Sequence, residues 1–251
     1  MSIILVGLNH KSSPLEIREK VSLSKNQIFQ ISEKLKSARS IFGSAILSTC
    51  NRTEFYLNVG SAALGLNEAI EIISKKSGIL VDELESYLYI KKNKDAVQHL
   101  FFVAAGLDSM ILGESQIQGQ VQDAYEIALD TEISDSIINT LFMNALTVGK
   151  RVRTETQIDR ESVSISSAAV SLAKRFYNGL EDKVVLVLGA GETSELTTRH
   201  LISNGIKNFI VANRTYERAE KLANELGGIA IRFDALFEYI DYADIIISST
   251  A

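Results

Sequence analysis

Residues 184–194, VVLVLGAGETS, decide the fold of the second half of the chain. The run 184–188 is entirely apolar, as is typical of a parallel strand that is covered on both faces. It continues directly into residues 189–191 (GAG) and then into a helix that we expect to end near Asn204. The first glycine permits a tight turn and the second lets a pyrophosphate approach the backbone. This order of elements therefore predicts a dinucleotide-binding loop.

The segments after this loop alternate between helix and strand. We expect helices at 215–226 and around 235–239, and further strands at 209–212, 229–231 and 244–248. The order β-α-β-α-β-α-β indicates a doubly wound parallel sheet of the α/β Rossmann type. Because such sheets have about six strands and the sequence ends just after the fourth, we expect this domain to be incomplete at its C-terminus.

The cofactor expected in this loop is NADP. At the end of the second strand, where an NAD site carries an acidic residue, Arg214 suits a 2′-phosphate. Ser194 replaces the third glycine and can add a hydroxyl near the phosphates. The residues expected to bind the cofactor are Gly189, Ala190, Gly191, Glu192, Thr193, Ser194, Asn213, Arg214 and Thr215. The alternative is a sheet of this type that binds another ligand or none.

The first part of the chain mixes strands and helices around one core, which predicts an α+β domain over residues 1–158. A linker helix at 159–179 would connect it to the Rossmann domain, 180–251. In the first domain, apolar and alternating runs predict strands at 3–9, 45–47, 53–59 and 87–91, and helical spacing predicts helices at 14–21, 24–37, 66–77, 94–107, 116–130 and 136–158.

The only cysteine, Cys50, lies in the polar stretch 48–54 (STCNRTE) between two strand-like runs. If this stretch is extended, Cys50 and Arg52 share a face, since side chains two apart point the same way in a strand. A guanidinium nearby favours the thiolate, which is the nucleophile. The alternative is a buried cysteine that only fills the core.

Three other features are candidates for a site. The glycine-hinged stretch 106–120 is polar and lies between two helices, where a binding loop is expected, although a plain turn with Ser115 as N-cap would give the same pattern. The basic run 150–153 is either a solvated face or a contact for a phosphate backbone. His99 sits beside the apolar stripe of its helix, which favours a structural role. The three histidines and one cysteine show no metal-ligand spacing.

Composition narrows the class of protein. A single cysteine in 251 residues excludes a disulfide framework and is typical of a reducing compartment. The N-terminal apolar run is too short for a signal peptide or a membrane span, so we expect a cytoplasmic protein with no membrane partner. The net charge of −5 argues against general nucleic-acid binding.

An NADP-binding domain and a reactive thiol in one chain suit a single reaction. A thiolate that attacks an acyl group forms a thioester, which accepts hydride far more readily than an ester or a carboxylate. The pairing therefore predicts an acyl reductase.

The motifs resemble those of the glutamyl-tRNA reductase family along essentially the whole chain. They are residues 7–11 (GLNHK), 48–54 (STCNRTE), 113–117 (GESQI), 149–153 (GKRVR), 189–192 (GAGE) and 213–215 (NRT). The resemblance implies an N-terminal catalytic domain, an NADPH domain and a C-terminal helical dimerisation domain, the last of which we expect to be absent here.

The resemblance also implies a reaction. Cys50 would attack the ester carbonyl of glutamyl-tRNA, and NADPH would reduce the thioester to glutamate-1-semialdehyde in the first step of tetrapyrrole synthesis. Arg52 would hold the substrate carboxylate, and His99 would act in proton transfer or orientation. The residues implied to hold the glutamyl group are Thr49, Cys50, Asn51, Arg52, Ser109, Glu114, Ser115, Gln116 and Gln120.

Expected partners are glutamyl-tRNA, a second copy of the full-length chain and a glutamate-1-semialdehyde aminomutase. Two alternatives remain. One is an oxidoreductase like shikimate dehydrogenase, since GAG followed by NRT occurs in such domains as well, but it leaves Cys50 without a role. The other is a non-catalytic tRNA-binding or regulatory module.

Overall fold

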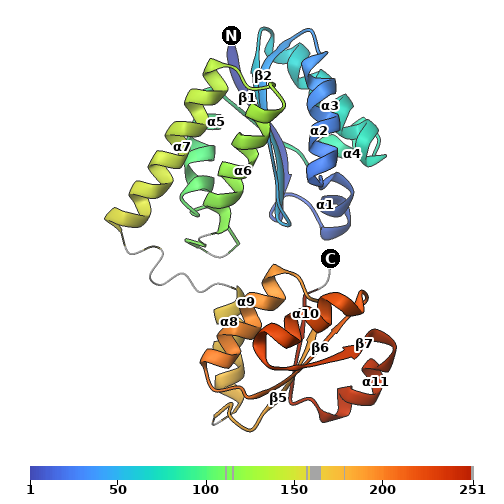
Figure 1. Ribbon diagram of the computed structural model, residues 1–251. Coiled ribbons are helices and arrows are strands. Elements are labelled where there is room, and N and C mark those ends of the chain that lie inside the picture. Colours follow the sequence, from blue (N-terminus) through green and yellow to red (C-terminus); the bar gives the residue numbers. More distant parts are fainter. Residues whose placement is uncertain (111, 115, 157, 159–164, 178, 250–251) are drawn as a thin grey trace. The chain divides into compact units, whose positions relative to one another are not determined.

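The protein divides into two compact units, Met1–Ser162 and Val163–Ala251. The structure, a computed structural model shown in Figure 1, describes residues 1–110, 112–114, 116–156, 158, 165–177 and 179–249. Within these ranges, no helix is both long and apolar enough to cross a lipid bilayer.

The first unit is built on a four-stranded antiparallel sheet in the order β2-β3-β1-β4. The strands are β1 (Ser2–Asn9), β2 (Ile41–Ser48), β3 (Arg52–Val59) and β4 (Tyr89–Lys92). The long first strand is central because it pairs with β3 on one side and β4 on the other, and all but its first two residues are buried. This is the split β-α-β arrangement, in which the helices between strands cover the sheet.

Helices cover both faces of this sheet (Figure 1). Alternate residues of β1 divide between the two layers: Ile4 and Val6 pack in one core, and Leu5 packs in the other. The first core takes side chains from α1 (Leu15–Val21), α2 (Lys25–Lys36), α3 (Ala62–Ser77) and α4 (Val81–Glu85). The second takes them from α5 (Lys94–Ala104), α6 (Gln116–Asp130) and α7 (Ser136–Glu155).

Local sequence signals set several helix starts. Ser24 and Gln27 form a reciprocal capping box at the start of α2, which confirms Ser24 as the N-cap. At the start of α7, the Asp135 carboxylate accepts the Ile138 N–H at 2.9 Å and an N–H of Asn58 at 2.5 Å. The same side chain thus caps the helix and attaches it to β3.

The second unit is a parallel sheet in the order β7-β6-β5-β8. This confirms the predicted alternation of strand and helix and the α/β Rossmann type. Its elements are α8 (Ile165–Phe176), β5 (Val184–Leu188), α9 (Glu192–Ser203), β6 (Asn208–Asn213), α10 (Tyr216–Leu226), β7 (Ile229–Arg232), a 3-10 turn (Phe233–Ala235), α11 (Leu236–Tyr239), a second 3-10 turn (Ile240–Tyr242) and β8 (Ile245–Ser248).

The strand order reverses between β5 and β8, because β6 and β7 continue on one side of β5 while β8 lies on the other. Such a switch point is where ligands bind in open parallel sheets. One face of the sheet packs on α8, α9 and α10, and the other packs on α11. Val170 and Ala173 of α8 belong to the core of this unit, although the sequence set residues 159–179 apart as a linker.

The boundaries differ from expectation in two places that matter for the site. Helix α5 ends at Ala104 rather than near residue 107, and Asp108 and Ser109 lie in the following loop, where residues 106–120 were expected to form one. The strand-like runs around Cys50 end at Ser48 and resume at Arg52, so Cys50 itself lies in a turn. The short helix α4 was not predicted.

Candidate functional site

Cys50 lies on the turn that connects β2 to β3, and its side chain is exposed. The Thr49 hydroxyl accepts the N–H groups of Asn51 and Arg52, each at 3.2 Å, and the Thr49 N–H donates to the Arg52 carbonyl at 2.8 Å. These bonds reverse the chain, as Thr side chains commonly do in turns. The expectation that Cys50 and Arg52 share a face of an extended strand is therefore wrong.

Arg18 of α1 is the cation that contacts this turn. Its Nη1 donates to the Cys50 carbonyl at 3.0 Å and to Asn51 Oδ1 at 3.4 Å. The pKa of the Cys50 thiol is raised, chiefly by partial burial and by the Glu114 carboxylate, while the Arg18 charge opposes the rise. The prediction that Arg52 favours the thiolate is not confirmed, because the charges acting on the thiol are those of Glu114 and Arg18.

Arg52 is buried, with 2% of its side chain exposed, and is held by two carboxylates. Its Nη1 donates to Glu54 Oε1 at 2.7 Å, and its Nη2 donates to Asp108 Oδ2 at 3.1 Å and to the Asp108 carbonyl at 2.6 Å. Lys11 also binds the Asp108 carboxylate, at 2.6 Å. In this state the guanidinium that was predicted to hold the substrate carboxylate is bonded to the protein's own carboxylates.

Glu54 is the centre of a buried polar network. Besides Arg52, its carboxylate accepts hydrogen bonds from the hydroxyls of Tyr56 and Tyr89 and contacts His99 Nε2 at 2.8 Å. Although burial alone would raise it, the hydrogen bond from His99 and the Arg52 charge lower the pKa of Glu54 to about 2. The structure thus places His99 in this network. Its Nε2 bonds Glu54, which in turn bonds Arg52.

Three polar atoms around this site are buried without a hydrogen-bond partner among the described residues: His10 Nδ1, Arg18 Nε and Ser109 Oγ. His10 follows β1, and its backbone N–H donates to the Asn51 carbonyl at 2.9 Å. The pKa of His10 is lowered by burial and by Lys11, Arg52 and Arg18, which favours the neutral ring. Buried polar atoms without partners are uncommon in folded proteins and are candidates for ligand contacts.

The predicted binding loop lies between α5 and α6. Gly106 and Gly113 both have positive φ, and the Gly113 N–H donates to the Gly106 carbonyl at 2.9 Å. Arg153 of α7 donates to the carbonyls of Ala104 and Glu114 at 3.3 and 3.1 Å and also bonds the Gln118 side chain. The basic run 150–153 was the candidate for a phosphate-backbone contact, but its Arg153 instead fastens this loop to α7.

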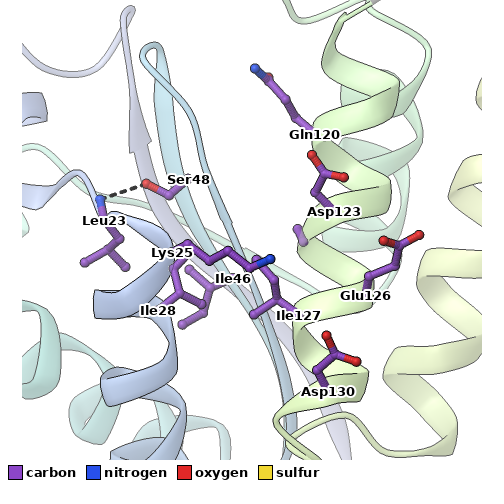
Figure 2. Close-up of a pocket in the computed structure, with 11 residues that line it drawn as sticks. Leu23, Lys25, Ile28, Ile46, Ser48, Gln120, Asp123, Glu126, Ile127 and Asp130 are labelled. Carbon is purple, nitrogen blue, oxygen red and sulfur yellow. Dashed lines mark hydrogen bonds between the residues drawn. The ribbon is translucent and has the colours of Figure 1, made fainter. Parts of the chain in front are cut away.

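The remaining predicted substrate residues are spread over this loop and α6. Ser115 lies outside the described residues, and Gln116 begins α6 with an exposed side chain. Gln120 lines a pocket of about 370 Å³ between α2 and α6 (Figure 2). Figure 2 shows Asp123, Glu126 and Asp130 along α6 in the same pocket, with Lys25 of α2 extending toward them. Ser48, just before the Cys50 turn, also lines it and accepts the Leu23 N–H at 3.0 Å.

In the second unit, the predicted phosphate loop lies at the end of β5 beside the switch point. Gly189 has φ +106°, and a Cβ there would lie 2.3 Å from the Ser249 carbonyl, so only glycine fits. Around Gly191 nothing lies within 4 Å of a Cβ, which leaves the approach to the backbone open. Ala190 is half-buried between the glycines, Glu192 begins α9, and the Thr193 carbonyl accepts the Thr197 hydroxyl at 2.7 Å.

Ser194 is fully buried, and its hydroxyl lies 3.4 Å from the Ser249 carbonyl. The expectation that this hydroxyl faces the phosphates is therefore not confirmed, because the side chain packs against the end of β8. A small residue is needed at this position since the helix approaches the sheet closely there.

The ends of β6 and β7 form a second pocket, with a volume of about 630 Å³. Its lining includes the predicted Asn213, Arg214 and Thr215, and it adds Arg232, which pairs with Asp234 at 3.4 Å. Arg214 and Arg232 are both exposed and line this pocket, so two guanidinium groups lie at the ends of β6 and β7.

Sequence reasoning missed four residues: Arg18, Glu54, Asp108 and Arg232. Glu54 and Asp108 could have been suspected only from the rule that a buried arginine needs carboxylate partners, which presupposes knowing that Arg52 is buried. No local signal marks Arg18 or Arg232. In the described part of the chain, no group of three or more His, Cys, Asp or Glu residues is placed to hold a metal ion.

Comparison with known proteins gives two family matches. Residues 6–156 match the family model described as the N-terminal domain of glutamyl-tRNAGlu reductase, and residues 171–251 match that of shikimate/quinate 5-dehydrogenase. The first match covers more than half of the chain.

Individual relatives are similar in sequence to this chain along its whole length. It is 51% identical over 251 residues to the glutamyl-tRNA reductase of Pelotomaculum thermopropionicum and 48% identical over 250 residues to that of Carboxydothermus hydrogenoformans. In both cases it covers 56% of the relative, so it spans little more than half their length. The solved glutamyl-tRNA reductase of Methanopyrus kandleri is 38% identical with a TM-score of 0.60, over 99% of this chain and 58% of that one.

Proposed function

The chain belongs to the glutamyl-tRNA reductase family, and from that premise we propose that it reduces glutamyl-tRNA to glutamate-1-semialdehyde with NADPH. The observation that carries this proposal is the exposed position of its only cysteine, on a turn at the polar end of the first sheet. A cysteine that only filled the core would be buried, as free cysteines usually are.

In the first step, the Cys50 thiolate attacks the acyl carbon of the glutamyl ester. A carbon–sulfur bond forms, the carbon–oxygen bond to the terminal ribose breaks, and the ribose oxygen leaves with a proton. The pKa of the Cys50 thiol is raised in the free protein. Ionisation of the thiol must therefore be favoured by the bound substrate or by a nearby group that accepts the thiol proton. The neutral His10 ring beside the turn has an unpartnered Nδ1 that suits such an acceptor.

The groups that hold the glutamyl moiety are proposed from the same end of the sheet. Thr49 and Asn51 lie on the Cys50 turn, and Ser109 lies in the loop after α5. The other proposed residues come from the end of that loop and from α6: Glu114, Ser115, Gln116 and Gln120. Arg52 would bind the substrate carboxylate in a bidentate fashion only if Asp108 releases Nη2. His99 orients Arg52 through Glu54 in this proposal.

The second unit fits a nicotinamide dinucleotide. The open backbone at Gly191 and the start of α9 suit the pyrophosphate, with Gly189, Ala190, Glu192, Thr193 and Ser194 completing the loop. Asn213, Arg214 and Thr215, joined by Arg232, suit an adenosine ribose with a 2′-phosphate and so support NADPH. When bound, this cofactor supplies the hydride that converts the thioester to the aldehyde and releases the Cys50 thiolate.

The wider setting is proposed on the same basis. The full-length protein would act in the cytoplasm as a homodimer in porphyrin and haem biosynthesis, and it would pass its reactive aldehyde to an aminomutase that forms 5-aminolevulinate.

The test is to trap the acyl intermediate. The chain is mixed with glutamyl-tRNA without NADPH, quenched in acid and digested, and the peptide containing Cys50 is examined by mass spectrometry for a glutamyl adduct. Cys50→Ser is the control and should show no adduct while tRNA binding persists. An adduct on another residue, or semialdehyde formation by Cys50→Ser, would contradict the thioester route. Oxidation of NADPH with a small hydroxy acid or keto acid instead would favour the chemistry of the shikimate dehydrogenase type.

A further inference from the structure

Arg18 is the feature that the motifs do not explain. It lies on α1 with a half-buried side chain, four residues after Pro14, whose carbonyl accepts its backbone N–H at 3.1 Å. Its Nη1 donates to the Cys50 carbonyl at 3.0 Å and to Asn51 Oδ1 at 3.4 Å, although Cys50 is 32 positions away in the sequence. Its Nε is buried with no hydrogen-bond partner in the described part of the chain.

We propose that Arg18 is the positioning residue of the thiol, because it fixes the Cys50 turn through two acceptors and supplies the positive charge that favours the Cys50 thiolate. This inference rests on the proposed role of Cys50 as a nucleophile. It assigns to Arg18 the role that the sequence had assigned to Arg52.

The geometry separates the two arginines. The guanidinium of Arg52 is buried and neutralised by Glu54 and Asp108, so its field at the turn is largely cancelled. Arg18 has no carboxylate within salt-bridge distance among the described residues, and its acceptors are a neutral carbonyl and a neutral amide. Its charge therefore remains available to the turn.

Two opposing charges act on the thiol. Glu114, from the loop before α6, raises the pKa of Cys50, and Arg18, from α1, lowers it. His10, at the end of β1, is held toward its neutral form by the cations around it, including Arg18, so it adds little charge near neutral pH. The backbone hydrogen bond at Cys50 also lowers this pKa, so loss of Arg18 removes one of two effects that oppose burial and Glu114.

The two acceptors also explain why an arginine is used. A planar guanidinium can bond the carbonyl of one residue and the side chain of the next from a fixed direction, whereas an ammonium is a point charge on a flexible stem. Lysine at position 18 would keep the charge and lose the fixed geometry.

The experiment uses the single cysteine. The rate of iodoacetamide alkylation of Cys50 is measured against pH, without tRNA or cofactor, for the wild type, Arg18→Gln, Arg18→Lys and Glu114→Gln. Arg39→Gln, an exposed arginine between α2 and β2, is the matched control. We expect the midpoint for Arg18→Gln to rise by about half to one pH unit, that for Arg18→Lys to rise less, and that for Glu114→Gln to fall. The control should not shift.

A folded Arg18→Gln with the wild-type midpoint would overturn the proposal, as would equal shifts in Arg18→Gln and Arg18→Lys. If Arg18→Gln does not fold, a wild-type midpoint in Arg18→Lys overturns it instead. Since alkylation needs no substrate, a shifted midpoint together with failure to trap a glutamyl adduct would refute the proposed function and leave the role of Arg18 standing.

Discussion

His99 Nε2 lies 2.8 Å from Glu54 Oε1, and both side chains are buried between α5 and β3. The contact ties helix α5 to the strand that leaves the Cys50 turn. The same oxygen of Glu54 accepts a hydrogen bond from Arg52 Nη1 at 2.7 Å. Substitution of His99 should therefore alter the position of the Glu54 carboxylate and, through it, that of Arg52.

Replacing Glu54 by glutamine should destabilise the first unit strongly. The amide keeps the shape but removes the charge that compensates buried Arg52, and breaking a buried ion pair from one side costs about 3–5 kcal/mol. The free energy of unfolding, measured with urea, is the readout. Glu155→Gln is the control, because it removes a carboxylate from the exposed pair with Arg151 and should change stability little. Equal effects of the two substitutions would contradict the buried network.

The same carboxylate predicts a dependence of stability on acid. The folded pKa of Glu54 is about 2, below its usual value of 4.5, so the unfolded chain binds the proton first as the pH falls. Its contribution is complete above about pH 4.5 and is lost as the pH falls toward 2. Urea unfolding of the wild type should therefore weaken over this window, by up to about 3 kcal/mol. Glu54→Gln should lack this part of the slope, and identical slopes in both proteins would refute the assignment.

Asp108→Asn should make Arg52 more available to an added carboxylate. Asp108 occupies Arg52 Nη2 at 3.1 Å, and its removal should cost about 1 kcal/mol of stability. We expect glutarate to raise the Tm of Asp108→Asn more than that of the wild type, and glutaramide to raise neither. Lys11→Gln is the control, because it removes the other partner of Asp108 and leaves the Arg52 pair in place. No difference between glutarate and glutaramide would count against Arg52 as a carboxylate anchor.

Arg214→Gln should weaken NADPH binding about tenfold while leaving NADH binding nearly unchanged, since one charge-assisted hydrogen bond to a phosphate is lost. Arg232→Gln should have a smaller effect, because Asp234 already shares that guanidinium. Fluorescence titration of the reduced nicotinamide gives both affinities. Arg199→Gln is the matched control, as this exposed arginine of α9 pairs with Glu195 and Glu225. Equal losses for NADPH and NADH would place the 2′-phosphate elsewhere.

Local sequence determined the second unit almost completely. The apolar run 184–188, the glycines after it and the alternating segments that follow are contiguous signals, and the structure has strands and helices at those places. Helix α6 begins and ends where its spacing predicted, and Ser24 caps α2. Each of these features depends on residues within a few positions of one another, which is the range over which capping and periodicity act.

Only the tertiary structure decided the chemistry around Cys50. Four residues, 49–52, reverse the chain and separate Cys50 from Arg52. The alternation of polar and apolar residues in β3 was read correctly, but its polar face is covered by helices rather than by water, so Glu54 is buried and recruits Arg52 and His99. Arg52 and Asp108 are 56 positions apart, and Arg18 and Cys50 are 32 apart. The sequence singled out Cys50 as the candidate nucleophile from its chemistry. The charged residues around it were selected by burial, which pairs residues across the fold without regard to their separation along the chain.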